Sequence, residues 1–409
     1  MGLTPYKCTV SNMSAAIMVL GGNIYTVPSV LSLKEAGFKV VVVDGNPEAP
    51  AFDIADACGT FDFRDWERGL ALARAQKVQA VIPTHDRAVL PAALISEALG
   101  LRGPSPDAAR TATSKKLMRR AWSASGLPSP AIALARTVEE FKKAAAGIGF
   151  PAICKPTDDV GGGSRGVQRL DTQTDLAQAY AFATSFSDSP EVLVEPYYEG
   201  LEHSVEVLMR DGDGVALMVS DKVKTPPPYR VDKSVIYPTR LTGAALQRVR
   251  MLSVDAARAV GLRDGAAHVE LCTLPDGGNA LFEIGLRCGG GATPHPIALL
   301  ASGVNEIVEY AHILTGGVRD FSPKFAKGAV FHFITAKPGK LLYVAGFDAA
   351  RAMPGIIEAG LTAKPGSTVN EIRTSADRLG YFVAAGETAD EAYRRALAAE
   401  QQLTFEYGN

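Results

Sequence analysis

The chain has 409 residues, of which 47% are apolar and 21% charged, and its formal net charge is -2 at pH 7. This length suits roughly three domains with cores of their own, and the nearly neutral charge excludes the basic surface that binds nucleic acid or anionic membranes. The five cysteines are scattered without a CxxC pair, which argues against a disulfide framework and a zinc site and indicates a reducing compartment. Because no apolar run approaches the ~20 residues of a membrane span and the N-terminus lacks a signal-peptide pattern, we expect a cytoplasmic protein.

The first part of the chain alternates strands and helices. The pattern predicts strands over residues 15–20, 38–43 and 78–82 and helices over residues 27–36 and 87–99. This alternation is typical of a parallel sheet with helices on both faces, whose strand ends can line a substrate cleft. The turn Gly21-Gly22-Asn23 invites a dinucleotide interpretation, but GxGxxG is absent, so we predict no nicotinamide site.

The middle of the chain carries a candidate phosphate loop. After a capping box at Thr137 and Glu140, a strand over residues 152–155 ends in Lys155 and enters the glycine-rich loop 157–166. The loop contains Gly161, Gly162, Gly163 and Ser164. Clustered glycines after such a strand let backbone N–H groups surround phosphate oxygens, although a hairpin tip is the alternative if the loop stood alone. The Walker A ending is missing, which excludes a P-loop NTPase.

Strands are also predicted over residues 191–195 and 202–209, with a hairpin turn at 211–214 and helices over 244–260 and 305–314. Residues 222–230 combine three basic residues with three consecutive prolines, which predicts an exposed, semi-rigid lid over a substrate. The rest of the chain from about residue 318 is mixed strand and helix. It contains a second capping box at Thr388 and Glu391 and a helix ending near Glu400.

A hairpin over residues 265–286 organises the predicted site. Its arms alternate between apolar and polar residues, and a four-residue turn, 275–278, pairs Leu274 with Asn279. Counting back by twos gives the pairs Cys272 with Leu281, Glu270 with Glu283, and His268 with Gly285. Two carboxylates whose Cβ atoms lie roughly 5 Å apart destabilise a sheet. We therefore predict a divalent cation between them, Mg²⁺ above all, with a solvated polar face as the alternative.

Together these elements resemble the ATP-grasp superfamily of carboxylate–amine ligases, most closely its L-amino-acid ligase branch, over nearly the whole chain. The segment 46–56 is similar to the stretch after the second strand in that branch, and 150–156 looks like the grasp strand. The resemblance implies an α/β fold with α+β lobes. Its domains are a flavodoxin-like or Rossmann-like domain at 1–105, an ATP-grasp domain at 106–317 with a lid lobe at about 126–198 followed by a large lobe, and a small C-terminal α+β domain at 318–409.

The resemblance also implies site residues and the cofactors ATP and Mg²⁺, with Mn²⁺ as an alternative metal. Lys155 and Lys115 look like the phosphate lysines, Glu202 like the ribose-binding carboxylate, and Glu270 and Glu283 like the metal ligands. The hinge that takes adenine matches Glu195, Pro196, Tyr197 and Tyr198. Arg287 resembles the arginine that steadies the reacting phosphoryl and acyl groups. His268 next to the metal pair either orients the acyl substrate, accepts a proton from the amine, or is structural.

One position departs from the pattern. Many members carry Asn two residues after the second metal-binding Glu, as a further ligand, and here the residue is Gly285. We therefore expect the second magnesium ion to be bound less fully, or through water.

Three functions are compatible with these residues. The first is an ATP-dependent ligase that forms an amide or peptide bond through an acyl phosphate, with a small carboxylate and an amine as substrates. The second is activation of bicarbonate or carbamate, as in purine-pathway carboxylases or carbamoyl-phosphate-synthetase-like enzymes. The third is a nucleotide-binding module without turnover. The opposed Glu270 and Glu283 favour an enzyme, and a homodimer through the first domain is the expected assembly.

Overall fold

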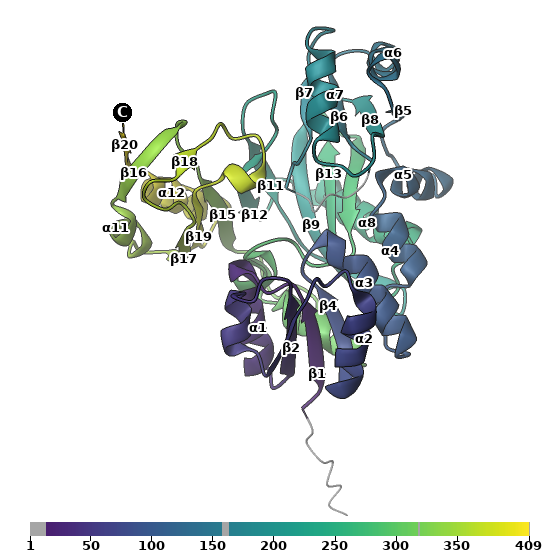
Figure 1. Ribbon diagram of the computed structural model, residues 1–409, viewed down its shortest axis with the longest axis vertical. Helices are drawn as coiled ribbons and strands as arrows, with labels where there is room; N and C mark the ends of the chain where they lie inside the picture. Colours follow the sequence, from purple (N-terminus) through teal and green to yellow (C-terminus); the bar gives the residue numbers. More distant parts are fainter. Residues whose placement is uncertain (1–13, 158–162, 318–319, 409) are drawn as a thin grey trace, which may run out of the picture.

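The computed structural model describes residues 14–157, 163–317 and 320–408. Figure 1 shows the N-terminal part at the bottom, residues 133–196 at the top and the C-terminal part at the left. Short helical turns connect the main elements: η1 (Ile24–Thr26), η2 (Pro50–Ile54), η3 (Thr293–Ile297) and η4 (Ser375–Asp377).

The first domain contains a parallel sheet with the strand order β3-β2-β1-β4. Its strands are β1 (Ala16–Leu20), β2 (Lys39–Asp44), β3 (Ala57–Thr60) and β4 (Val78–Pro83), and its helices are α1 (Val27–Glu35), α2 (Trp66–Ala75) and α3 (Asp86–Ala98). Because side chains alternate along β1, Ile17 and Val19 pack with α1 while Met18 and Leu20 pack with α2 and α3. The strands and helices predicted for this domain are confirmed, whereas β3 and α2 were not predicted. β3 is a four-residue edge strand in which only Gly59 is buried.

Residues 133–157 and 163–196 form a unit that we call the lid lobe. Its sheet is antiparallel, with the strand order β5-β8-β6-β7. Its elements are β5 (Ala133–Ala135), α6 (Val138–Ile148), β6 (Ala152–Pro156), β7 (Gln168–Leu170), α7 (Leu176–Thr184) and β8 (Val192–Pro196). The predicted capping box of α6 is only half present. The Thr137 hydroxyl accepts from the Glu140 N–H at 3.2 Å, but the Glu140 carboxylate accepts from the N–H of Arg136 at 2.7 Å instead of that of Thr137.

The large lobe carries an antiparallel sheet with the order β10-β9-β13-β14. Its strands are β9 (Leu201–Arg210), β10 (Asp213–Val219), β13 (Gly265–Thr273) and β14 (Asn279–Gly285). Helices α4 (Pro106–Ala112), α5 (Lys115–Ala124), α8 (Gly243–Ala259), α9 (Ala298–Ser302) and α10 (Glu306–Leu314) belong to the same part of the chain. Val249 and Ala257 of α8 pack against Val207 and Val269 of the sheet, which gives this face its core.

A five-stranded sheet with the order β11-β12-β15-β19-β17 joins the middle of the chain to its end. Its strands are β11 (Asp221–Lys224), β12 (Asp232–Tyr237), β15 (Gly328–Ile334), β17 (Ile356–Leu361) and β19 (Gly380–Gly386). A smaller sheet contains β16 (Gly339–Ala345), β18 (Thr368–Val369) and β20 (Thr404–Gly408), and the helices are α11 (Phe347–Arg351) and α12 (Ala389–Glu400). The prediction of an exposed basic segment from residue 222 is wrong for Lys222 and Lys224, because both lie in β11 with side chains 2% and 10% exposed.

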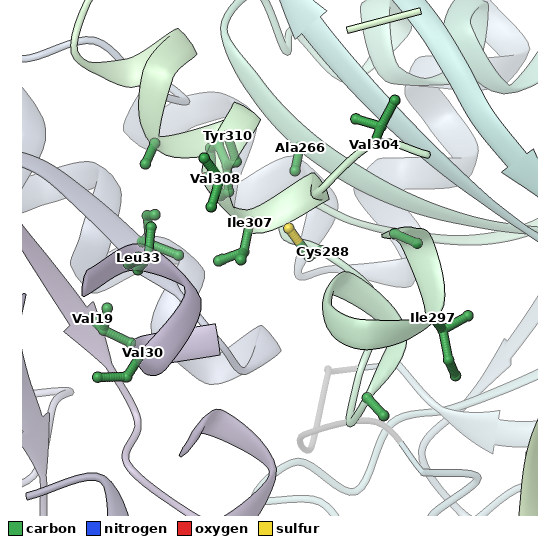
Figure 2. Close-up of a cluster of buried hydrophobic side chains, with 14 of the residues drawn as sticks. Val19, Val30, Leu33, Ala266, Cys288, Ile297, Val304, Ile307, Val308 and Tyr310 are labelled. Carbon is green, nitrogen blue, oxygen red and sulfur yellow. The ribbon is translucent and has the colours of Figure 1, made fainter. Parts of the chain in front are cut away.

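One apolar cluster joins three of these units. It includes Val30 and Leu33 of α1, Ile307 and Val308 of α10, and Phe331 of β15. Figure 2 shows side chains of α1 and α10 facing each other within this cluster. The lid lobe instead has a separate core. The first domain, the large lobe and the C-terminal sheet therefore share a core that the lid lobe does not enter.

In the part of the chain that the structure describes, no single helix is long and apolar enough to cross a membrane. Two helical segments, Thr293–Ser302 and Glu306–Leu314, meet the length and composition test only when taken together across a 107° bend.

The end of α12 is fixed by one carboxylate, which makes stability depend on pH. Glu400 contacts the Lys233 ammonium and lies 2.9 Å from Nε2 of His332. Burial alone would raise the pKa of Glu400, but His332 and Lys233 together lower it to about 2. A carboxyl whose pKa is lowered in the folded protein stabilises the folded state at pH values above its ordinary pKa of about 4.3. This stabilisation is lost as the pH falls from there toward the pKa in the folded state.

We therefore expect Glu400→Gln to reduce the free energy of unfolding at pH 7 and to reduce it less at pH 3. Urea unfolding of both proteins at the two pH values measures this difference. An equal loss at both pH values would contradict the assignment.

Candidate active site

The β13–β14 hairpin places two carboxylates opposite each other. Glu270 pairs with Glu283 and His268 with Gly285, as predicted. The predicted turn is wrong, because Asn279 pairs with Thr273 rather than Leu274. The predicted pairing of Cys272 is wrong for the same reason: Cys272 lies opposite Ala280 and not Leu281. Phe282 is an extra residue in β14, a β-bulge that shifts the register back by one before the carboxylate pair.

The bulge has a direct effect on the site. Neighbouring residues of a regular strand point to opposite faces, yet Phe282 and Glu283 both line one cavity of about 170 Å³. Phe282 stacks on Tyr198 with ring centroids 6.4 Å apart and an interplanar angle of 25°. An aromatic surface therefore lies beside the carboxylate pair.

This cavity brings together most of the predicted site residues. Its lining includes Lys115, Lys155, Gly163, Ser164, Glu195, Pro196, Tyr197, Tyr198, Glu202, Glu270, Glu283 and Arg287. Gly161 and Gly162 lie outside the described residues. His268 does not line this cavity but a second, neighbouring one. The predicted nucleotide and metal residues thus converge from the lid lobe and the large lobe.

Lysines hold the two carboxylates in place. Nζ of Lys115 lies 3.1 Å from Oε1 of Glu283, and Nζ of Lys222 lies 2.6 Å from Oε1 of Glu270. Burial alone would raise the pKa of Glu270, but Lys222, with His268 and Lys224, holds it well below its usual value. Glu270 is therefore ionised at neutral pH, as a cation ligand must be.

The residues fit magnesium that arrives with a nucleotide. Among the described residues there is no group of three or more His, Cys, Asp or Glu side chains that could hold a metal ion by themselves. Mg²⁺ commonly takes one or two protein carboxylates and completes its shell with phosphate oxygens and water. The pair Glu270 and Glu283 has this composition.

Lys155 and Glu195, which line this cavity, belong to a buried cluster of charged side chains. Nζ of Lys155 lies 2.6 Å from Oε1 of Glu195, and Nη2 of Arg119 lies 2.8 Å from Oε2 of the same carboxylate. Burial lowers the pKa of Lys155, while burial would raise that of Glu195 and the two cations lower it. The predicted adenine residue Glu195 thus has both carboxylate oxygens engaged by Lys155 and Arg119, and Arg119 was not among the predicted residues.

A second group of charges surrounds the predicted ribose residue. Glu202 lies 3.0 Å from Nζ of Lys224 and 3.3 Å from Nη2 of Arg230. Lys224 also lies 2.8 Å from Asp232. The spacing of Lys222 and Lys224 could have predicted their place in the site, because residues two apart in a strand lie on the same face. The three prolines that follow instead favoured an exposed loop over a strand.

Arg287 is held by the first domain. Its Nη2 lies 2.5 Å from Oδ2 of Asp86 at the start of α3, and its Nη1 donates to the Cys288 carbonyl at 2.8 Å. A Cβ atom at Gly285 would lie 2.7 Å from Oδ1 of Asp86. Asp86 therefore occupies the space that a side chain at position 285 would need, and sequence reasoning missed it because the two residues are 199 positions apart.

The second cavity measures about 390 Å³ and lies between the first domain, the large lobe and the C-terminal sheet, with Gly163 and Arg165 of the lid lobe also in its lining. His268 lines it and places Nδ1 2.6 Å from Oε1 of the buried Glu206. Burial alone would lower the pKa of His268, but Glu206 and Glu270 raise it to about 9. Arg287 lines both cavities and thus lies where the smaller cavity meets the larger one.

Comparison with known proteins agrees with this geometry. An ATP-grasp domain matches residues 148–295, and an L-amino acid ligase C-terminal domain 2 matches residues 332–408. The chain is 30% identical over 305 residues to the uncharacterized protein y4rH of Sinorhizobium fredii, and the match covers 73% of this chain but only 62% of that protein. It is 27% identical over 405 residues to the formate-dependent phosphoribosylglycinamide formyltransferase of Burkholderia thailandensis, with 95% of each chain covered. The crystal structure of L-amino acid ligase from Bacillus licheniformis has a TM-score of 0.81 at 19% identity and covers 97% of this chain and 99% of its own.

The fold, the lysine and glutamate cavity and the matching domain together define the class: residues 148–295 match an ATP-grasp domain, and the chain has the fold of a solved L-amino acid ligase. Over residues 332–408 the chain matches the L-amino acid ligase C-terminal domain 2. The predicted family and fold class are thereby confirmed. The domain boundaries and the roles of individual residues stay predictions.

Proposed function

We propose that this chain is an ATP-dependent ligase that joins two amino acids, or an amino acid and a small carboxylic acid, through an amide bond. The observation that carries the proposal is the pair Glu270 and Glu283, which face each other in a cavity that also holds Lys115 and Lys155. A nucleotide-binding module has no need of two opposed carboxylates beside phosphate-binding lysines.

The reaction requires activation of a poor electrophile. The carboxylate of one substrate attacks the γ-phosphorus of ATP, which forms an acyl phosphate and releases ADP. The amine of the second substrate then attacks the acyl carbon and displaces inorganic phosphate. Magnesium bound with the nucleotide would neutralise the charge that develops on the transferred phosphoryl group.

The protein supplies positioning and positive charge. Lys155, Lys115 and the loop at Gly163 and Ser164 would bind the phosphates, and Arg287 would stabilise charge on the acyl phosphate because it lines both cavities. The Phe282–Tyr198 surface and the hinge at 195–198 suit the adenine, and Glu202 suits the ribose hydroxyls. His268, which points into the second cavity, would orient the acyl substrate.

The test is phosphate release from the purified protein with ATP and Mg²⁺ and pairs drawn from a panel of amino acids and small acids that includes formate. We expect release that depends on both members of one pair, together with a product whose mass equals their sum less one water. No stimulated release across a broad panel would contradict the proposal.

Activation of a one-carbon acid is the second candidate. It is favoured by the full-length similarity to a formate-dependent formyltransferase. The second cavity argues for a larger acid. Its volume of about 390 Å³ is more than bicarbonate or formate needs, and its aromatic lining by Tyr25, Phe331 and Phe333 suits an apolar side chain. Turnover that requires bicarbonate or formate and no larger acid would reverse this preference.

Two further expectations belong to this proposal. A cytoplasmic location suits an ATP-consuming enzyme whose four described cysteines, Cys58, Cys154, Cys272 and Cys288, are all free. Assembly as a homodimer through the first domain stays a prediction, which light scattering of the purified protein would measure.

A further inference from the structure

The turn Gly21-Gly22-Asn23 contacts His85, a histidine that lines the second cavity. A Cβ atom at Gly21 would lie 2.7 Å from Cδ2 of His85 and 2.2 Å from Oγ1 of Thr84, and Gly21 has a φ of +109°. Only glycine therefore fits this close approach of β1 to the end of β4. The His85 ring also stacks on Phe63, with centroids 5.9 Å apart and an interplanar angle of 10°.

Asn23 determines which nitrogen of His85 carries the proton. The Asn23 carbonyl oxygen Oδ1 accepts the backbone N–H of Tyr25 at 2.9 Å, so the amide group Nδ2 is the atom that faces Nε2 of His85 at 3.2 Å. An amide NH₂ can only donate. Nε2 must accept this hydrogen bond, and the proton of the neutral ring lies on Nδ1.

The surroundings of the ring keep it neutral. Burial lowers the pKa of His85, Arg287 and Arg165 lower it further, and Asp86 and Asp44 oppose them without reversing the shift. Asp44 is already engaged by the Gly22 N–H at 2.7 Å, and Asp86 by Arg287. These surroundings favour the uncharged ring, which carries a single N–H donor.

The second cavity around His85 favours an anion. The described Arg and Lys residues that line it are Arg165, Lys222, Arg287 and Arg378, whereas the Asp and Glu residues are Asp86, Asp232 and Glu270. All three carboxylates are in contact with lysine or arginine. Arg378 is buried on the Phe333 ring, 3.5 Å from its centroid, and its Nε has no hydrogen-bond partner.

We propose that this end of the second cavity binds the free carboxylate of the amine substrate, and that Asn23 positions His85 to donate Nδ1–H to it. The inference rests on the proposed ligase function and narrows its second substrate to amines that carry a carboxylate, such as an amino acid. Asn23 is a positioning residue, because it acts through His85.

The variant Asn23→Asp tests the inference without removing the turn, since Asp also accepts the Tyr25 N–H. A carboxylate next to Nε2 draws the ring proton to Nε2 and leaves a lone pair on Nδ1, which repels the substrate carboxylate. We expect the KM for the amine substrate to rise about tenfold at pH 8.5 and to recover toward the wild-type value at pH 6, where protonation restores Nδ1–H. The KM for MgATP and the kcat should change little.

The matched control is Asn46→Asp, a neighbouring asparagine whose Oδ1 accepts the Glu48 N–H at 3.0 Å. We expect it to leave the KM unchanged at both pH values. ¹⁵N NMR of the imidazole should show the proton on Nδ1 in the wild type and on Nε2 in Asn23→Asp. In addition, the wild type should use an amino acid at least tenfold better than the corresponding amino acid amide.

The outcomes separate the two proposals. No amine-dependent turnover by the wild type overturns the proposed function and, with it, this substrate assignment. Turnover by the wild type together with an Nε2–H tautomer, an amide used as well as the acid, or equal KM values for Asn23→Asp and Asn46→Asp overturns the present inference alone.

Discussion

Replacing Glu283 by Gln is expected to lower the rate of substrate-dependent phosphate release by about 10²–10³-fold. Gln has nearly the same shape, so the hairpin should fold as before, but it removes one of the two opposed negative charges in the cavity. It also leaves the buried Lys115 without its carboxylate at 3.1 Å. The measurement is kcat with saturating ATP, together with the affinity for ADP by calorimetry in the presence and absence of Mg²⁺.

We expect the affinity for metal-free ADP to change less than tenfold, because the Phe282–Tyr198 surface and Glu202 are untouched. The control is Glu387→Gln, an exposed carboxylate paired with Lys327 far along the chain, which should keep full activity. A variant that turns over normally would contradict the proposed role of the Glu270–Glu283 pair. A variant that loses ADP affinity as strongly as activity would show that Glu283 acts on nucleotide binding instead.

The second large effect is expected at Gly285. The resemblance to ATP-grasp proteins with Asn at this position would suggest that Gly285→Asn improves metal binding. The structure leads us to expect the opposite, because a Cβ atom there would lie 2.7 Å from Asp86 and would displace it from Arg287. We expect kcat to fall about 10- to 100-fold, since small displacements of a positioned group cost rates of that order.

A glycine outside both cavities provides the control. Gly147 is exposed in α6 and has no atom within 4 Å of its added Cβ, so Gly147→Ala should keep activity within about twofold of the wild type. Steady-state kinetics and a Mn²⁺ titration followed by electron paramagnetic resonance would distinguish a metal ligand from a steric clash. Tighter metal binding with higher activity in Gly285→Asn would support a ligand role for that side chain, and lower activity in that variant with normal activity in Gly147→Ala would support the contact with Asp86.

Much of the architecture follows from local sequence patterns. The apolar run of β1, the capping threonine before α6 and the hairpin turn predicted at 211–214 are local signals. The structure contains each of these elements, although the turn itself is only Asp211-Gly212, because Asp213 and Gly214 already pair in β10. The opposition of Glu270 and Glu283 was predicted for a reason that is only partly right, since the turn is shifted by one residue and the bulge at Phe282 compensates. A bulge is set by packing on both faces of a sheet, and alternation in one strand does not reveal it.

The parts that were missed depend on contacts between distant segments. Asp86 and His85 come from the first domain, and Arg378 comes from the segment between η4 and β19 in the C-terminal part. Each comes from a segment whose own sequence reads as an ordinary helix start or loop. Lys222 and Lys224 were expected in an exposed loop, but pairing of β11 with β12 buries them against Glu270, Glu202 and Asp232.

The separate core of the lid lobe determines how nucleotide can enter and leave. Phe141, Cys154 and Val194 pack only within that lobe's own cluster, whereas the cluster around Leu33 and Ile307 spans the other three units. Tilting the lid lobe would therefore expose no shared apolar core, while separating any of the other units would. Opening for ADP release should accordingly be a rigid swing of the lid lobe, which would carry Gly163 and Arg165 away from the second cavity while the walls formed by the other three units stay in place.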